Sequence, residues 1–195
     1  MKKKDIGKTV VSMVLICAVL LGAYAILHSR EGNRKNDSAK TDTEAQLLLQ
    51  KDYERNYPAT VREVLNQYLR ISQCLYNEAV TDAEFDGLVR MMRLLYDEEL
   101  LAENPELSYK ETLKKEITSA KDNKHLMQFY AVDKLSSAVY WTADEENFAS
   151  LVVCITMNKD GKLEKSYEEF LLREDESRRW KIVGWRLTDA VEISN

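Results

Sequence analysis

The stretch that decides the fold is FASLVVCITMNKDGKLEKSYEEFLLR, residues 148–173. Its apolar residues recur with a period of two, and it is rich in β-branched and aromatic side chains, which is typical of β-strands. Asp160-Gly161 interrupts the pattern, and this dipeptide is a strong signal for a hairpin turn. The stretch therefore predicts two antiparallel strands, at 148–157 and 162–173.

The register of this hairpin depends on the length of its loop. A two-residue loop places Val153 opposite Glu168. A three-residue loop, with Gly161 in the left-handed conformation, places Val153 opposite Tyr167 instead. We prefer the three-residue loop because it pairs apolar residues with apolar residues.

Two further runs with a period of two flank the hairpin, at 128–141 and 180–188. Short connections between the four runs predict a sequential antiparallel meander of four strands. Alternation along the last run predicts which side chains share a face. One face is expected to carry Val183, Trp185 and Leu187, and the other Trp180 and Ile182.

Before His125 the apolar residues follow a helical period instead. Their i, i+3, i+4 spacing over 61–75 predicts one long amphipathic helix. Pro58 suits the first turn of that helix, while Thr60 with Glu63 forms a capping box one turn on, so both starts remain open. A shorter helix is expected at 45–56.

Two more helices are predicted from capping patterns. Thr81 with Glu84 begins one of them, and Pro105 ends it. Ser108 with Glu111 forms the pattern that begins the next. The sequence thus predicts an α+β domain in which three to four helices pack on a curved four-stranded antiparallel sheet.

The start of the chain predicts a membrane anchor. Thr9–Leu27 holds nineteen residues without a charge, and a helix of that length spans roughly 30 Å of hydrocarbon. Four lysines in residues 1–8 predict a cytoplasmic tail before a transmembrane helix at 9–28. The alternative is a signal peptide cleaved after Ala25, at Ala23-Tyr24-Ala25. We favour the anchor because the apolar run exceeds the usual signal core.

The anchor is followed by a polar segment, residues 29–43, that predicts a disordered linker. Residues 1–43 carry eight basic and four acidic side chains, so residues 44–195 have a net charge of −9. This acidic part is expected to form one extracytoplasmic domain at the cell membrane. Its charge argues against a nucleic-acid partner, because such binding relies on Lys and Arg neutralising phosphates.

The cysteines show no spacing that is typical of a metal site or of a disulfide framework. Cys74 and Cys154 are expected to be small buried hydrophobic residues, with a disulfide between them as the alternative. With two histidines in the chain and no CxxC pattern, we expect no metal and no cofactor.

The closing phrase Trp180-Lys181-Ile182-Val183-Gly184-Trp185, after helices and then a meander, resembles the nuclear transport factor 2-like superfamily, which includes ketosteroid isomerases and polyketide cyclases. The resemblance covers residues 45–190 and is nearest to membrane-tethered Gram-positive bacterial proteins without an assigned activity. It implies a cone with an apolar pocket, an extracytoplasmic bacterial setting and a homodimer formed through the open sheet face.

No catalytic motif of that superfamily can be matched residue by residue, so no catalytic, cofactor or metal residue is assigned. Candidates by residue type alone are His125, Asp133, Tyr68, Tyr96, Tyr130 and Tyr140. We expect a non-enzymatic, membrane-anchored interaction or ligand-binding module. The alternatives are a structural subunit of an envelope or conjugative type IV secretion assembly, and an isomerase- or cyclase-type enzyme. The enzyme would require a buried acid or histidine beside a tyrosine hydroxyl inside the cone.

Overall fold

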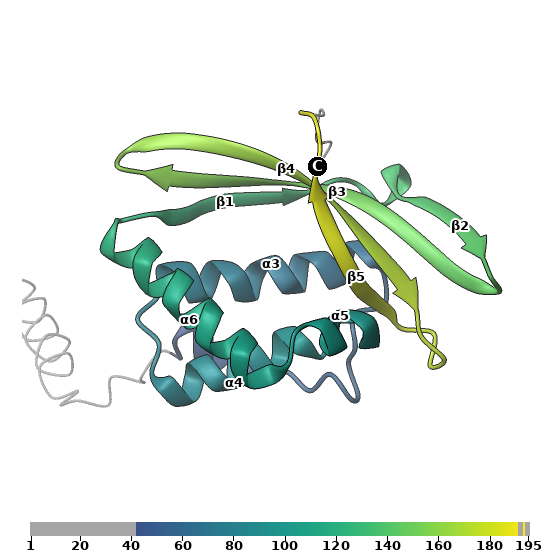
Figure 1. Ribbon diagram of the computed structural model, residues 1–195, viewed down its shortest axis with the longest axis horizontal. Helices are drawn as coiled ribbons and strands as arrows, with labels where there is room; N and C mark the ends of the chain where they lie inside the picture. Colours follow the sequence, from purple (N-terminus) through teal and green to yellow (C-terminus); the bar gives the residue numbers. More distant parts are fainter. Residues whose placement is uncertain (1–41, 191–192, 194–195) are drawn as a thin grey trace, which may run out of the picture. The chain divides into compact units, whose positions relative to one another are not determined.

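The computed structural model describes residues 42–190 and Ile193. Within these residues, five α-helices cover one face of a five-stranded antiparallel sheet (Figure 1). The predicted α+β class is therefore confirmed, while the prediction undercounted both helices and strands. The core lies between the two layers. It includes the fully buried side chains of Leu65, Leu69, Leu88, Leu151, Phe170, Leu172 and Ile182.

The first two helices begin at side-chain caps. Helix α2 spans Glu44–Leu49 behind the cap residue Thr43 and is shorter than predicted. A turn follows it, in which the Asp52 carboxylate accepts hydrogen bonds from the backbone N–H groups of Glu54 and Arg55. Helix α3 spans Val61–Asn77 with Thr60 as its cap, so the capping-box start is correct and the Pro58 start is wrong.

Helix α4 begins as predicted but ends early. It spans Asp82–Arg93 behind Thr81, and the chain then leaves the helix to pair with the last strand. The backbone N–H of Asp97 donates to the carbonyl of Ile182 at 2.8 Å. A longer helix would have used these backbone N–H and C=O groups for its own hydrogen bonds. The tertiary contact with β5 therefore overrides the local helical pattern.

Two helices follow where one was expected. Helix α5 spans Glu98–Glu103, and α6 spans Glu106–Asp122 directly after Pro105. The predicted capping box at Ser108 and Glu111 is wrong. The Ser108 hydroxyl donates to the Pro105 carbonyl at 3.0 Å, and the cap position is Pro105, three residues earlier than predicted.

The strands follow the predicted sequential order, except that one predicted run forms two strands. The run expected at 128–141 forms two strands, β1 at Leu126–Val132 and β2 at Val139–Ala143, separated by a 3₁₀ turn at Leu135–Ser137. Both strands pair antiparallel with β3, which spans Glu146–Lys159. Strand β4 at Lys162–Glu174 and strand β5 at Trp180–Leu187 complete the sheet.

The preferred register of the β3–β4 hairpin is wrong. Lys159 pairs with Lys162, which leaves the two-residue loop Asp160-Gly161, and Val153 lies opposite Glu168. Asp160 and Gly161 have φ angles of 53° and 83°. Two successive positive φ angles match the tight turn whose twist suits a hairpin, so local turn geometry decides the register.

The faces predicted for β5 are correct within each group, because Trp180 and Ile182 share a face and so do Trp185 and Leu187, but wrong in placing the two groups on opposite faces. The pairing with β4 shifts between Leu171 and Leu172, so Trp185 lies opposite Phe170 and Ile182 lies opposite Leu172. This bulge contains one extra residue and rotates the rest of the strand by one face. Trp185 therefore shares the helix-covered face with Ile182.

No helix among the residues that the structure describes is long and apolar enough to cross a bilayer. The predicted basic tail at 1–8, the transmembrane helix at 9–28 and the cleavage site after Ala25 lie outside those residues. So does the predicted linker at 29–43, except for Asp42 and the cap residue Thr43.

Candidate functional site

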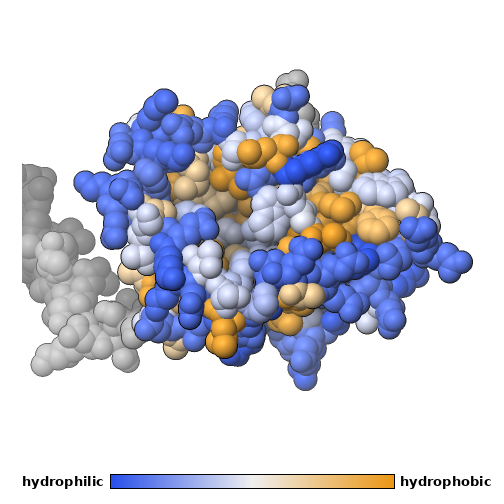
Figure 2. All heavy atoms as spheres, in the orientation of Figure 1, coloured by the Kyte–Doolittle hydropathy of each residue, from blue (hydrophilic) through white to orange (hydrophobic). Residues whose placement is uncertain are grey.

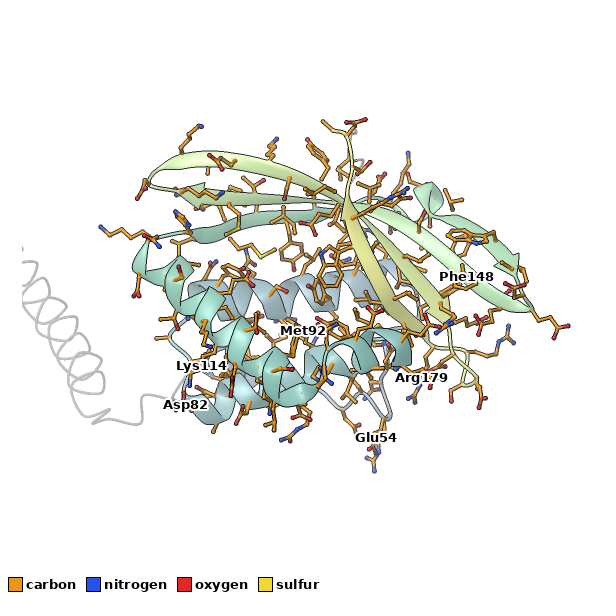
Figure 3. All side chains as sticks on the ribbon, viewed as in Figure 1. Glu54, Asp82, Met92, Lys114, Phe148 and Arg179 are labelled. Carbon is orange, nitrogen blue, oxygen red and sulfur yellow. The ribbon has the colours of Figure 1, made fainter. Side chains whose placement is uncertain are left out.

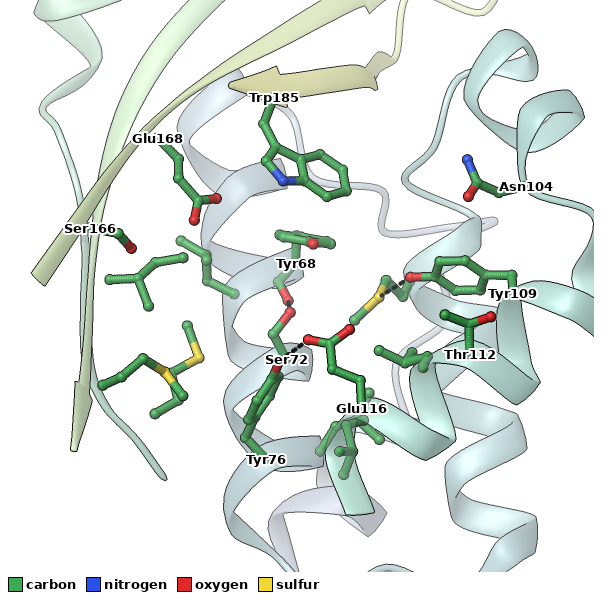
Figure 4. A pocket seen from close by; sticks show the side chains of 18 of the residues that line it. Tyr68, Ser72, Tyr76, Asn104, Tyr109, Thr112, Glu116, Ser166, Glu168 and Trp185 are labelled. Carbon is green, nitrogen blue, oxygen red and sulfur yellow. Dashed lines mark hydrogen bonds between the residues drawn. The ribbon is translucent and has the colours of Figure 1, made fainter. Parts of the chain in front are cut away.

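A pocket of about 530 Å³ lies between the helices and the covered face of the sheet (Figure 4). Strands β3, β4 and β5 form one wall, and α3 and α6 form the other, with the end of α5 at one side. In the space-filling view this side of the domain has a recess with polar residues around it (Figure 2). The volume lies within the roughly 300–1,000 Å³ usual for small-molecule sites.

Glu168 is the distinctive residue of the sheet wall. It belongs to β4, where its neighbours across the sheet are Val153 on one side and Leu187 on the other. Its carboxylate has no hydrogen-bond or ion-pair partner among the described residues. Burial raises the pKa of Glu168 above its ordinary value. The pocket therefore contains an acceptor group whose partner the protein itself does not supply.

Aromatic rings gather next to this carboxylate. Trp185 stacks on Phe170 with ring centroids 5.3 Å apart, and Tyr68 from α3 packs against both rings at 5.8 and 5.5 Å. Tyr68 and Trp185 line the pocket, and Figure 4 shows the Glu168 side chain beside them. The bulge in β5 creates this arrangement because it turns Trp185 inward.

The helical wall is held by a hydrogen bond between α3 and α6. The Tyr76 hydroxyl donates to the Glu116 carboxylate. The pKa of Tyr76 is raised, first by burial and second by this bond. An ion pair of 2.6 Å between Lys114 and Asp82 then ties α6 to the start of α4 (Figure 3). These contacts fix the position of α6 over the sheet.

Hydroxyl groups extend from the pocket lining at Tyr109 to Tyr96 behind it. The hydroxyls of Tyr96 and Tyr109 are 2.8 Å apart, and the Tyr109 hydroxyl lies 3.4 Å from the sulfur of Met92. Burial raises the pKa of Tyr68 and of Tyr96, so both phenols stay neutral across the physiological range. They can donate or accept hydrogen bonds, but they are poor proton acceptors.

The pocket lining carries charge of one sign. Its acidic residues are Glu168 and two exposed residues, Glu103 and Glu116, which we call the rim carboxylates. Among the described residues that line it there is no lysine, arginine or histidine. Arg93 lies outside the lining, with its guanidinium carbon 5.5 Å from the centroid of the Tyr109 ring.

The structure places one of the six sequence candidates in the pocket and a second behind it. Tyr68 lines the pocket, and Tyr96 packs against it with ring centroids 6.2 Å apart. The other candidates lie away from the pocket lining: His125, Asp133, Tyr130 and Tyr140.

Structural contacts are evident for Asp133 and Tyr140. Asp133 is buried, and its carbonyl accepts a hydrogen bond of 3.1 Å from Arg62. Tyr140 packs edge to face on Trp180, and His125 follows the turn that ends α6. None of these contacts directs the side chain toward the pocket.

Sequence reasoning missed the residues that give the pocket its chemistry. The wrong hairpin register paired Val153 with Tyr167 instead of Glu168, and the unrecognised bulge separated Trp185 from Ile182. The signals were present in Asp160-Gly161, which suits a two-residue turn, and in Gly184, because glycine inside a strand often marks a bulge.

Cys74 and Cys154 are both buried free thiols, so the alternative of a disulfide is not realised. Burial raises the pKa of Cys74 to about 12. Cys154 lies next to inward-facing Val153 and therefore on the opposite face of the sheet. In the part of the chain that the structure describes, no group of three His, Cys, Asp or Glu residues is placed to hold a metal ion.

Comparison with curated proteins gives no match. A family model does match the chain, over residues 1–185, and it includes the apolar N-terminal run, the helices and most of the sheet. Because the match covers more than half of the chain, the protein belongs to the family described as Domain of unknown function (DUF6715).

Proposed function

We propose that this protein is a membrane-anchored, non-enzymatic binding module that presents a small-molecule pocket outside the cytoplasm. The observation that carries the proposal is the pocket of about 530 Å³ between α3, α6 and the sheet. Its lining combines apolar side chains with hydroxyl, amide and carboxylate groups that can orient a ligand, as small-molecule sites do.

The membrane anchor is supported by the uncharged run Thr9–Leu27 and the lysines before it. Assignment of the domain to the nuclear transport factor 2-like superfamily is supported by the curved sheet, with helices on one face and a pocket between the layers (Figure 1). A homodimer remains part of the proposal. It is supported by exposed apolar side chains of Phe129, Val139 and Trp141 on the sheet.

The binding function is tested by blocking the pocket. Thr112 is exposed on α6 and lines the pocket, so Thr112→Trp fills the space without disturbing the core. Thr118→Trp is the matched control, because Thr118 is exposed on the same helix but outside the pocket lining. Both variants are prepared as full-length chain in dodecyl maltoside micelles.

The measurement is equilibrium dialysis with 2-phenylpropan-2-ol, a neutral probe, and phenyltrimethylammonium, a cation of similar size. Empty micelles provide the reference. We expect saturable binding of at least one probe to the wild type and to Thr118→Trp, and a loss of at least about tenfold in Thr112→Trp. Binding of neither probe, or equal binding by both variants, contradicts the proposed function.

A second candidate function, proton transfer by an isomerase- or cyclase-type enzyme, is favoured by one observation. Glu168 is an unpartnered carboxylate with a raised pKa in a pocket that also contains Tyr68 and Tyr76. A general base needs such a tuned group within reach of its substrate. Deuterium exchange at the α-carbon of phenylacetone, abolished by Glu168→Gln, would favour the enzyme over the binding module.

A further inference from the structure

The Glu168 carboxylate, which we call the inner carboxylate, has no ion-pair or hydrogen-bond partner among the described residues. Two other partly buried carboxylates in the described domain have an arginine partner: Asp97 binds Arg173, and Glu44 binds Arg70. Glu168 is partly buried and has no such contact among the described residues, and its partial burial disfavours the charged form. A group from outside the protein that is positive, or that donates hydrogen bonds, would stabilise the charged form.

The residues around Glu168 favour a positive group over a neutral donor. Tyr68 and Trp185 line the pocket beside it, and the electron-rich faces of such rings attract organic cations. Their packing with Phe170 holds them in position before any ligand arrives. A carboxylate next to aromatic rings is a suitable environment for an ammonium group with apolar substituents.

The charges of the other lining residues also favour a cation. The rim carboxylates Glu103 and Glu116 add negative charge to the lining, and no lysine, arginine or histidine among the described lining residues offsets it. An anionic ligand would therefore meet repulsion from the rim to the inner carboxylate. A cation would be attracted along the same path.

We propose that the pocket selects a free organic cation with an apolar body, whose charged group lies against Glu168 beside Tyr68 and Trp185. This inference rests on the proposed binding function and adds the class of ligand. A cationic lipid headgroup that also carries a phosphate fits less well. Its phosphate would approach the rim carboxylates, so we assign the pocket to a cation without an anionic group.

The experiment compares three probes on the full-length chain in dodecyl maltoside micelles, by equilibrium dialysis against empty micelles. Phenyltrimethylammonium is the cation, 2-phenylpropan-2-ol is the neutral molecule of similar shape, and glycerophosphocholine represents a zwitterionic headgroup. The wild type is expected to bind the cation at least about tenfold more tightly than either of the others.

Glu168→Gln removes the charge and keeps the size of the side chain. We expect the affinity for the cation to fall about tenfold and the affinity for the neutral probe to stay the same. The ratio of the two affinities should then be about one. Glu164→Gln is the matched control. Glu164 lies four residues earlier on β4, where it pairs with Lys159 at 2.9 Å outside the pocket lining.

Each outcome bears on one of the two proposals. Neutral probe binding as tight as that of the cation, or an unchanged cation preference in Glu168→Gln, overturns the cation assignment and leaves the binding function intact. Glycerophosphocholine binding as tightly as phenyltrimethylammonium overturns the assignment to a free cation. Failure of every probe to bind overturns the proposed function itself.

Discussion

Glu168 of β4 lies directly opposite Val153 of β3, so its carboxylate occupies the face of the sheet that the helices cover. Val153 is fully buried, and Glu168 has no ion-pair or hydrogen-bond partner among the described residues. The protein thus keeps a charge where an apolar side chain would pack better. Such a choice is typical of functional sites, where stability is lower than it could be.

Glu168→Gln should therefore stabilise the ligand-free protein at pH 7, by about 1 kcal/mol or less. Burial raises the pKa of Glu168 above 4.5, so the folded state binds its proton more readily than the unfolded state. The wild type then gains stability as pH falls through the folded pKa towards 4.5. The difference between variant and wild type should shrink over that window and be absent below it.

Thermal unfolding at pH 7 and pH 4 measures this effect. The phenols that face Glu168, Tyr68 and Tyr76, have raised pKa values and stay neutral at both pH values. Glu164→Gln serves as the control, because its partly exposed carboxylate is already paired with Lys159. A Glu168→Gln protein less stable than the wild type at pH 7 contradicts the interpretation.

Arg173→Met should destabilise the domain by about 3 kcal/mol. Arg173 forms an ion pair with Asp97, whose side chain is only 5% exposed, so the variant leaves a buried charge without its partner. Urea unfolding measures the loss, and the double variant with Asp97→Asn should recover part of it. Arg178→Met is the control. Arg178 pairs with Glu174 but its side chain is 87% exposed, and its loss should cost less than about 0.5 kcal/mol.

Helix starts could be predicted because their signals are local. Thr60 with Glu63 and Thr81 with Glu84 form reciprocal side-chain and backbone hydrogen bonds within one turn. These contacts depend on residues three positions apart, so the sequence displays both partners together. The same reasoning failed at Ser108, because Pro105 had already started the helix.

The end of α4 depends on a partner far along the chain. The segment after Arg93 leaves the helix because Tyr96 forms a β-bridge with Ile182, and nothing within one helical turn of Arg93 reveals that contact. The apolar period alone continues past this point, which is why the predicted helix was too long. Such tertiary effects are beyond a local pattern.

The polar residues of the pocket wall were missed for a different reason. The predicted register was chosen because it paired apolar residues with apolar residues. The pocket wall, however, carries Ser166 and Glu168 among its apolar residues. Two-residue turn geometry at Asp160-Gly161 pointed to the correct register. The polar residues that broke the apolar pattern were therefore the signal of the site.

Gly161→Ala should destabilise the domain by about 1 kcal/mol. Gly161 has a φ of 83°, a conformation that side chains with a Cβ adopt at a cost, although open space surrounds the position. Gly184→Ala is the matched control, since it also has open space but no positive φ, and it should change stability by less than about 0.5 kcal/mol. Urea unfolding distinguishes the two, and equal effects would contradict the turn geometry.

The proposed membrane topology predicts which fusion reporter is active. Lysines at 2, 3, 4 and 8 should hold the N-terminus in the cytoplasm, so alkaline phosphatase joined after residue 195 should be active and β-galactosidase inactive. Replacing the four lysines with glutamate should reduce or reverse the difference.

The mass of the membrane-bound chain should include residues 1–25, because an uncleaved anchor keeps them. A mature mass that lacks these residues, restored by Ala25→Leu, would instead identify a cleaved signal peptide and remove the tether from the proposed function.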